Sequence, residues 1–135
     1  MFAKKKQPPI KSLIAQGTRI EGNVFFHDGL RIDGEVIGDL RASDEKPSIL
    51  VVSEVATVTG QIHADHVIIN GNVKGPVLAF ELLELQPKAS ITGDVNYEAL
   101  EMHQGAVIDG ELKSMKSEAR GDEKPPLKLA SSKQG

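Results

Sequence analysis

The chain has 135 residues and a formal net charge of −3, with no cysteine, no tryptophan and only 4% aromatic residues. The absence of cysteine excludes disulfides, thiolate metal ligands and a cysteine nucleophile. The scarcity of aromatics argues against a base-stacking surface for nucleic acid and against an aromatic-lined ligand pocket. No apolar run reaches the roughly 20 residues of a membrane span, and no secretory signal is evident. We therefore expect a single cytoplasmic domain.

The charge is distributed unevenly along the chain. Residues 1–16 carry four lysines and no acid, whereas residues 17–112 carry six basic and sixteen acidic residues, a charge of −10; residues 113–135 carry +3. An acidic body does not bind nucleic acid along its surface, because phosphate contacts need clustered Lys and Arg. We expect no nucleic-acid partner.

Residues 1–16 are predicted to form a disordered basic tail, since a lysine run and a proline pair cannot bury enough apolar surface to offset the entropy of ordering. The tail begins with Met1 and Phe2, followed by Lys4, Lys5 and Lys6. Two apolar side chains can insert into a membrane surface, and each lysine near an anionic leaflet adds about 1 kcal/mol. The alternatives are a tail without a role, and a cap on the first repeat formed by Ile10, Leu13 and Ile14.

The segment 17–112 is a repeat. A five-residue unit, aliphatic–x–Gly–x–aliphatic, occurs at 20–24, 32–36, 36–40, 58–62, 69–73, 73–77, 91–95 and 108–112. Its glycines Gly60, Gly75, Gly93 and Gly110 follow one another at steps of 15, 18 and 17 residues. A second marker, aliphatic–x–aliphatic, begins at Leu50, Val67, Leu83 and Leu100, at steps of 17, 16 and 17. Two independent markers agree on a period near 17, which indicates a solenoid.

Within each repeat the short period is two. From Ile20 to Ala42, nearly every apolar residue or glycine falls on an even position, and the odd positions hold mostly charged residues. This alternation is typical of strands with one buried face. The parity switches near residues 64–67 and 95–100, where corners are expected.

Short strands on a 17-residue period predict an all-β fold: a right-handed parallel β-helix, a three-sided solenoid of about five to six turns spaced about 4.8 Å apart. The predicted inward residues are Val36, Leu50, Val52, Val58, Val67, Ile69, Val73, Leu85, Ile91 and Val95. An antiparallel sandwich would also alternate, but it does not demand two markers with a common step. A left-handed β-helix keeps a strict hexapeptide beat, whereas the spacing here varies, which favours the right-handed coil.

Two segments interrupt or follow the repeat. Residues 43–48, SDEKPS, break the period and are predicted to form a loop on one corner. Residues 113–135 are rich in Ser, Lys, Glu, Gly and Pro and are predicted to form a disordered basic tail.

No catalytic, cofactor-binding or metal site is predicted. His63 and His66 are the one cluster with conceivable metal ligands, but in a strand they would point to opposite faces. The glycine-rich strings at 34–38 and 71–75 lack the Lys-Ser/Thr of a phosphate loop, so no nucleotide is expected. No serine sits in a nucleophile elbow.

The stretch 12–42 carries a family resemblance. Its run IAQGTRIEGNV followed by LRIDGEVIGDL resembles the bactofilins, the bacterial polymer-forming cytoskeletal proteins, and the later VTGQI, VIINGNVKGPV, ITGDV and VIDGEL are similar to the rest of the bactofilin domain. The resemblance covers 17–112, and Met1-Phe2 before the lysines is similar to the membrane-targeting segment of many members. It implies nucleotide-free, end-to-end filaments. It also implies a scaffold at the inner face of the cytoplasmic membrane that recruits cell-wall synthesis or hydrolysis proteins and influences cell shape.

The ends of the predicted coil are where copies would meet, because open strand edges pair with one another unless they are blocked. The candidate polymerisation residues are Leu100, Met102, Val107, Ile108 and Leu112 at one end, and Phe25 and Phe26 at the other. Val107 breaks the parity of Ile108 and Leu112, so we expect it to face outward. Side-by-side contact between bodies of charge −10 is disfavoured at low salt. The alternative function is a left-handed hexapeptide-repeat acyltransferase, or another β-solenoid binding protein.

Overall fold

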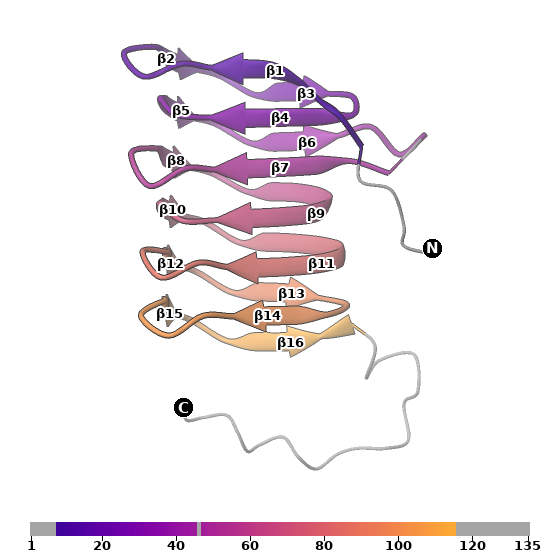
Figure 1. The fold of residues 1–135 in the computed structure, drawn as a ribbon, viewed down its shortest axis with the longest axis vertical. Coiled ribbons are helices and arrows are strands. Elements are labelled where there is room, and N and C mark those ends of the chain that lie inside the picture. Colours follow the sequence, from indigo (N-terminus) through magenta and orange to yellow (C-terminus); the bar gives the residue numbers. More distant parts are fainter. Residues whose placement is uncertain (1–7, 46, 116–135) are drawn as a thin grey trace.

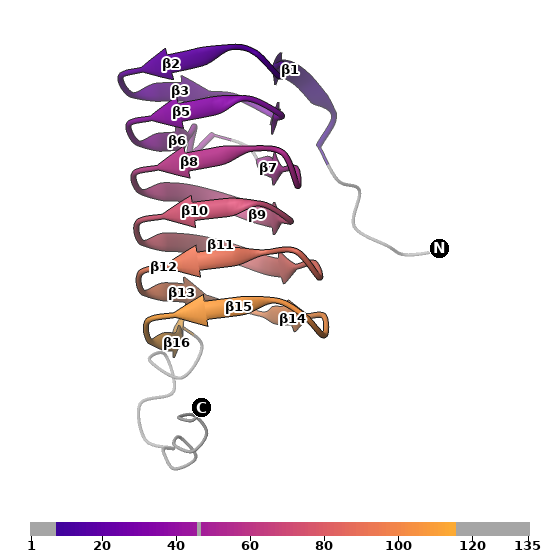
Figure 2. The same cartoon turned by 90° about the vertical axis from the view of Figure 1, so that its left-hand side faces the viewer.

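A computed structural model describes residues 8–45 and 47–115, and all sixteen regular elements in this part of the chain are β-strands. Every strand pairing is parallel, and the strands wind into a three-sided rod of six turns (Figures 1 and 2). With the first turn at the top of Figure 1, the front strands run to the left and the back strands to the right as the chain descends. The coil is therefore right-handed. The predicted fold is confirmed, and the left-handed alternative is wrong.

We name the three faces A, B and C in the order in which the chain visits them. Face A contains β1 (Ile10–Ile14), β4 (Gly29–Ile32), β7 (Ile49–Val52), the second halves of β9 (Ile62–Ile69) and β11 (Val77–Leu85), and β14 (Leu100–Met102). Face B contains β2 (Arg19–Glu21), β5 (Glu35–Ile37), β8 (Thr57–Thr59), β10 (Asn72–Lys74), β12 (Ser90–Thr92) and β15 (Val107–Asp109). Face C contains β3 (Val24–Phe26), β6 (Leu40–Ala42), the first halves of β9 and β11, β13 (Val95–Tyr97) and β16 (Leu112–Ser114).

The core is a set of aliphatic ladders that run along the rod. On face B, the strand register stacks Val36, Val58, Val73 and Ile91 directly on one another, and all four are buried. The ten residues predicted to point inward are all buried. Burying each side chain contributes about 1.5–3 kcal/mol, so the ladders are the main source of the fold's stability.

The corner between faces B and C explains the glycine marker. Gly75 has φ +146°, a conformation that side chains rarely adopt, and a Cβ there would collide with the carbonyl oxygen of Gly60 in the preceding turn. A Cβ on Gly60 would likewise collide with the carbonyl oxygen of Gly38. The backbones of successive turns approach so closely at this corner that only glycine fits.

The corner between faces A and B has two lengths. In turns one, three, five and six it has four residues and is closed by a hydrogen bond; in turn three Ala56 N donates to Ser53 O at 3.0 Å. In turns two and four it has only two residues, Asp33-Gly34 and Asn70-Gly71. The changing corner length explains why the repeat varies around 17 residues.

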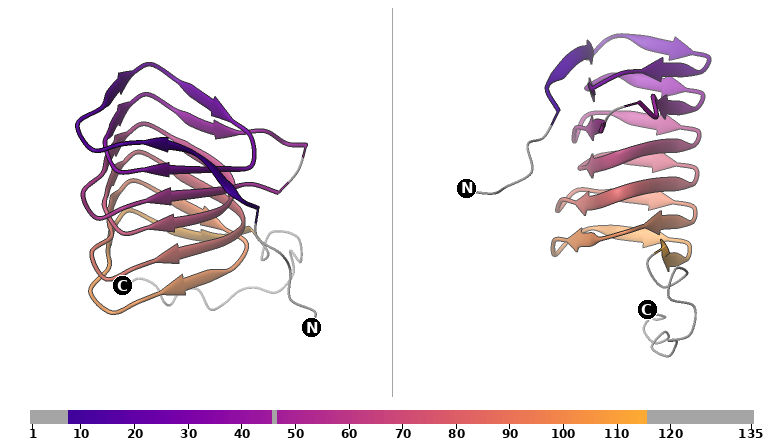
Figure 3. Two further views of the ribbon diagram at one scale, coloured as in Figure 1. Left: turned by 45° about the horizontal axis from the view of Figure 1, so that its top comes forward. Right: turned by 90° about the vertical axis from the view of Figure 1, so that its right-hand side faces the viewer.

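The corner between faces C and A holds the predicted loop. Residues 43–48 lie between β6 and β7, and the described residues on either side of Lys46 stand out from the rod in the left view of Figure 3. Lys46 itself lies outside the described residues. Asp65 fastens the end of the loop, because the carboxylate accepts a hydrogen bond from Ser48 N at 3.1 Å. In the next two turns β9 and β11 pass this corner as continuous strands, which accounts for the parity switch near 64–67. The strands also extend beyond the bounds 17–112, since β1 begins at Ile10 and β16 ends at Ser114.

A charge placed on a core ladder tests this fold. Ile91 is buried and pairs with Val73 and Ile108 in the adjacent turns. Ile91→Asp should unfold the coil, because an unpaired buried charge costs about 3–5 kcal/mol, which is comparable with the stability of a small domain. Circular dichroism should show loss of the β signal. Thr92→Asp, one residue along on the exposed side of β12, should remain folded; a folded Ile91→Asp protein would contradict the assigned ladder.

Candidate assembly surfaces

The C-terminal end of the rod leaves the core open. Met102 and Leu112 belong to the inward ladders, because they pair with Leu85 and Val95, which are fully buried. In the last turn the same positions are 46% and 43% exposed. Each earlier turn is covered by the turn that follows it, whereas no described residue covers this last turn. The apolar core therefore reaches solvent here.

The other predicted residues of this end divide into inward and outward positions. Leu100 and Ile108 are half-buried and pack against the core cluster. Val107 is 56% exposed on the outer side of β15, as its parity predicted. The three strands β14, β15 and β16 form the last turn and present the open hydrogen-bonding edges of faces A, B and C at the lower end of the rod (Figure 1).

The N-terminal end is better filled. Phe26 points inward on β3 and is buried, and Ile14 on β1 is buried as well. Ile20 and Val24 of the same turn are partly buried against the core. Phe25 is 62% exposed on the outer side of face C, with its ring edge-on to His27 at a centroid distance of 5.5 Å. The structure thus separates the two predicted phenylalanines: Phe26 belongs to the core and Phe25 to the surface.

The predicted membrane-targeting residues, Met1, Phe2, Lys4, Lys5 and Lys6, lie outside the described residues. No helix in the described part of the chain has the length and hydropathy needed to cross a membrane.

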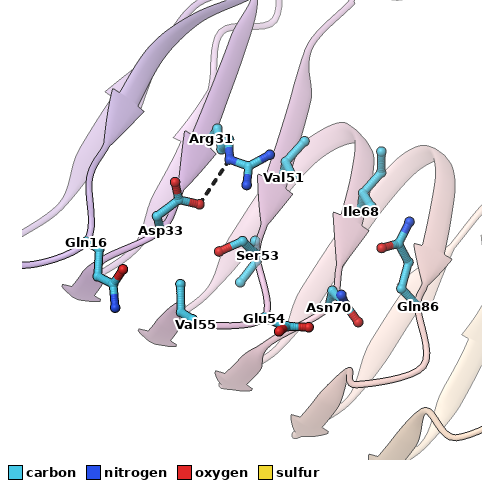
Figure 4. Close-up of a pocket in the computed structure, with 11 residues that line it drawn as sticks. Gln16, Arg31, Asp33, Val51, Ser53, Glu54, Val55, Ile68, Asn70 and Gln86 are labelled. Carbon is cyan, nitrogen blue, oxygen red and sulfur yellow. Dashed lines mark hydrogen bonds and ion pairs between the residues drawn. The ribbon is translucent and has the colours of Figure 1, made fainter.

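The flank of the rod carries a shallow hollow on face A, with a volume of about 370 Å³. Figure 4 shows Arg31, Val51 and Ile68 side by side on successive strands, with Asp33, Ser53 and Asn70 at the adjoining corner. Arg31 Nε donates to Asp33 Oδ1 at 2.9 Å. The sequence reasoning missed this surface, because outward residues of successive turns lie about 17 positions apart and carry no pattern of their own.

Face A also gathers acidic groups near its C-terminal end. Ligand atoms of Glu84, Glu101 and His103 lie within 4.8 Å of one another. Glu84 Oε2 accepts a hydrogen bond from Gln86 Nε2 at 3.2 Å and lies 3.7 Å from His103 Nε2. The three groups are the types that bind divalent cations, but surface carboxylates often gather in this way without one. The cluster by itself assigns no metal.

The fold perturbs the titration of His66. This histidine lies on face A between Ile49 and Leu82 of the adjacent turns and is buried. Burial lowers its pKa below 6.5, against an opposing effect from the carboxylates of Glu84, Glu81 and Glu101. The neutral imidazole is therefore the form that the folded protein favours. His63, on face C, instead contacts Phe80 with ring centroids 4.7 Å apart.

These features define a class: a right-handed β-solenoid whose aliphatic core runs uninterrupted to an open end. The sequence model of one family, described as Bactofilin, polymer-forming cytoskeletal, matches residues 12–113. Because this match covers most of the chain, the protein belongs to the bactofilin family of polymer-forming cytoskeletal proteins. Comparison with curated proteins and with solved structures gave no match.

The pKa of His66 predicts how stability depends on pH. His66 binds a proton more readily in the unfolded state than in the folded state. The contribution of neutral His66 to the free energy of unfolding is therefore complete above about pH 6.5 and is lost as the pH falls below that value. Thermal unfolding of the wild type and of His66→Leu should be compared between pH 7.5 and 5. The wild type should lose more stability than the variant on acidification; parallel curves would contradict the lowered pKa.

Proposed function

We propose that this protein is a bacterial cytoskeletal scaffold whose subunits join end to end into filaments without nucleotide. The observation that carries the proposal is the open last turn, where Met102 and Leu112 are exposed although their partners in the preceding turn are fully buried. The polymer-forming character of the family supports it.

An end-to-end joint would repeat the contact that one turn makes with the next. The free backbone groups of β14, β15 and β16 would gain partners on three faces, at the ordinary strand spacing of about 4.8 Å. Covering the half-exposed inward residues contributes on the order of 1 kcal/mol each. Because the rod carries an acidic body, end contact has an advantage over general side-by-side contact, which brings like charges together along the whole length.

The glycine-rich corners support assembly without a nucleotide. A Cβ on Gly34 would meet the carbonyl oxygens of Thr18 and Ala15, and one on Gly71 would meet that of Ser53. These glycines are therefore used for close packing between turns. A phosphate-binding loop needs free backbone N–H groups, but Gly34 N already donates a hydrogen bond to Ile14 O at 3.0 Å.

The N-terminal residues would hold the filament at the inner face of the cytoplasmic membrane. Residues 1–9 lie before β1 and would span at most about 30 Å if extended, which is enough for a short tether. One copy of Met1, Phe2 and three lysines binds weakly, and many copies on one polymer bind well through avidity. A membrane-bound filament of this kind would position cell-wall synthesis or remodelling proteins and so influence cell shape.

The end-to-end joint can be tested at Leu112 and Val107. Leu112→Arg should give a folded but short species, because the joint would bury an unpaired charge or bring two like charges together, at a cost of several kcal/mol. Val107→Arg, at the outer margin of the same turn, should also shorten the assemblies. Lys113→Gln, an outward neighbour on β16, is the matched control and should form filaments. Sedimentation and electron microscopy without nucleotide report the outcome.

Long filaments from folded Leu112→Arg and Val107→Arg proteins would move the joint elsewhere, to the Phe25–Phe26 end first. If the wild type forms no filaments, the proposed function is wrong.

Membrane attachment has a separate test. Deletion of residues 1–6, or Phe2→Glu, should release the protein from anionic liposomes and leave the filaments intact, since the described strands of the ladders run from Ile10 to Ser114. High salt should weaken binding by the wild type, because it screens the lysines. Liposome co-sedimentation that responds to none of these changes would rule out the N-terminal tether.

A further inference from the structure

We propose that face A pairs two copies of this chain side by side and antiparallel, so that filaments associate laterally in twos. The inference rests on the proposed function, because it concerns filaments. It concerns a surface that the end-to-end joint leaves free.

The surface in question is the outward row of face A, which contributes one residue per turn. Strand pairing stacks these residues in the order Leu13, Arg31, Val51, Ile68, Glu84 and Glu101. The row is therefore basic in turn two, apolar in turns three and four, and acidic in turns five and six. When a second copy lies antiparallel to the first, the basic end of its row therefore faces the acidic end of the first row, and the apolar centres face each other.

A two-fold axis along the strand direction, between turns three and four, sets each turn against one turn of the second copy. Val51 then faces Ile68 of the second copy, so the centre of the contact is apolar. Arg31 faces Glu84 of the second copy on one side of the axis, and the symmetry repeats this pair on the other side. Turn one meets turn six, where Leu13 faces Glu101 and adds no ion pair.

The neighbouring outward positions fit the same arrangement. At the corner, Asp33 would face Gln86 and Ser53 would face Asn70 of the second copy. The arrangement sets no two like charges opposite each other in these rows.

The corner lengths add a match of shape. The four-residue corner of turn three would face the two-residue corner of turn four, and the four-residue corner of turn five would face that of turn two, whereas the four-residue corners of turns one and six would face each other. Val55, exposed at the tip of the turn-three corner, would lie toward the hollow that Ile68 and Asn70 line in the second copy (Figure 4).

Other arrangements of the same face are less favourable. Parallel rods in register would oppose Arg31 to Arg31, Glu84 to Glu84 and Glu101 to Glu101, and each like-charge contact is repulsive. An antiparallel shift by one turn removes the Arg31–Glu84 pairs. Shifted one way, Arg31 meets Ile68 and forms no ion pair. Shifted the other way, Arg31 meets Glu101, but Val51 is set against Glu84 and only Ile68 against Ile68 remains of the apolar centre.

The area of the contact indicates that it forms between filaments and not between free subunits. Six turns of about 4.8 Å and strands of three to four residues give a footprint of roughly 300–400 Å² on each copy. Roughly 700 Å² in total is below the about 1,200 Å² of stable specific interfaces, so free subunits should not pair. Along two filaments the contact repeats at every subunit and becomes strong through avidity. The net negative charge of the rod opposes contact through the other faces, which limits association to pairs.

The test is the width of filaments in electron microscopy near 0.15 M salt. Wild-type filaments should be mostly double. Arg31→Glu and Glu84→Arg should each give single filaments, and the double variant Arg31→Glu/Glu84→Arg should restore pairs, because the swap recreates both ion pairs under the two-fold axis. Arg41→Glu makes the same charge change on face C and should leave the pairs intact. Ile68→Lys should abolish pairing while circular dichroism shows an unchanged fold.

The failures are distinguishable. Single wild-type filaments, or double filaments that survive Ile68→Lys, would overturn the lateral contact and leave the proposed end-to-end assembly standing. In the first case face A would be a surface for a different protein. A double variant that remains single would overturn the antiparallel register. Absence of any wild-type filament would overturn the proposed function, and the lateral contact with it.

Discussion

Backbone pairing between successive turns is the constraint on which the rest of this structure depends. Each turn forms its hydrogen bonds almost entirely with the turns before and after it, because the strands are parallel and three to nine residues long. A strand in the middle of the rod is therefore satisfied on both edges, and a strand in the first or last turn on only one. In the described part of the chain, the last turn leaves one edge of β14, β15 and β16 without a further strand, which connects the architecture to the polymer-forming character of the family.

The same constraint governs the interior. Since turns stack in register, a position on one strand faces the equivalent position on the next, and the core becomes a set of ladders of like side chains. The described core consists almost entirely of aliphatic side chains, and Phe26 in the first turn is its buried phenylalanine. The corner glycines have the same origin, because successive backbones approach there too closely for a Cβ.

Outward-facing positions are less constrained by packing than the core, so their residues can vary to serve function. Outward rows also stack turn on turn, but solvent accepts almost any residue, so each face carries its own sequence of charges. Face A runs from Arg31 through Val51 and Ile68 to Glu84, which makes the rod electrically and sterically different at its two ends. A rod with an open end and one patterned flank suits a scaffold, because the proposed end-to-end and lateral contacts would use different surfaces.

The sequence by itself determined the ladders, the period and the family. Val36, Val58, Val73 and Ile91 recur because packing in every turn demands the same residue type, and that demand leaves a pattern along the chain. Only the tertiary structure decided the burial of His66, the cluster of Glu84, Glu101 and His103, and the row that contains Arg31, Val51 and Ile68. These neighbours are brought together by corners of two or four residues, by a loop at 43–48 and by strands that bend without a break. Outward positions are under no common packing demand, so nothing in the sequence marks which of them lie side by side until the length of each corner is known.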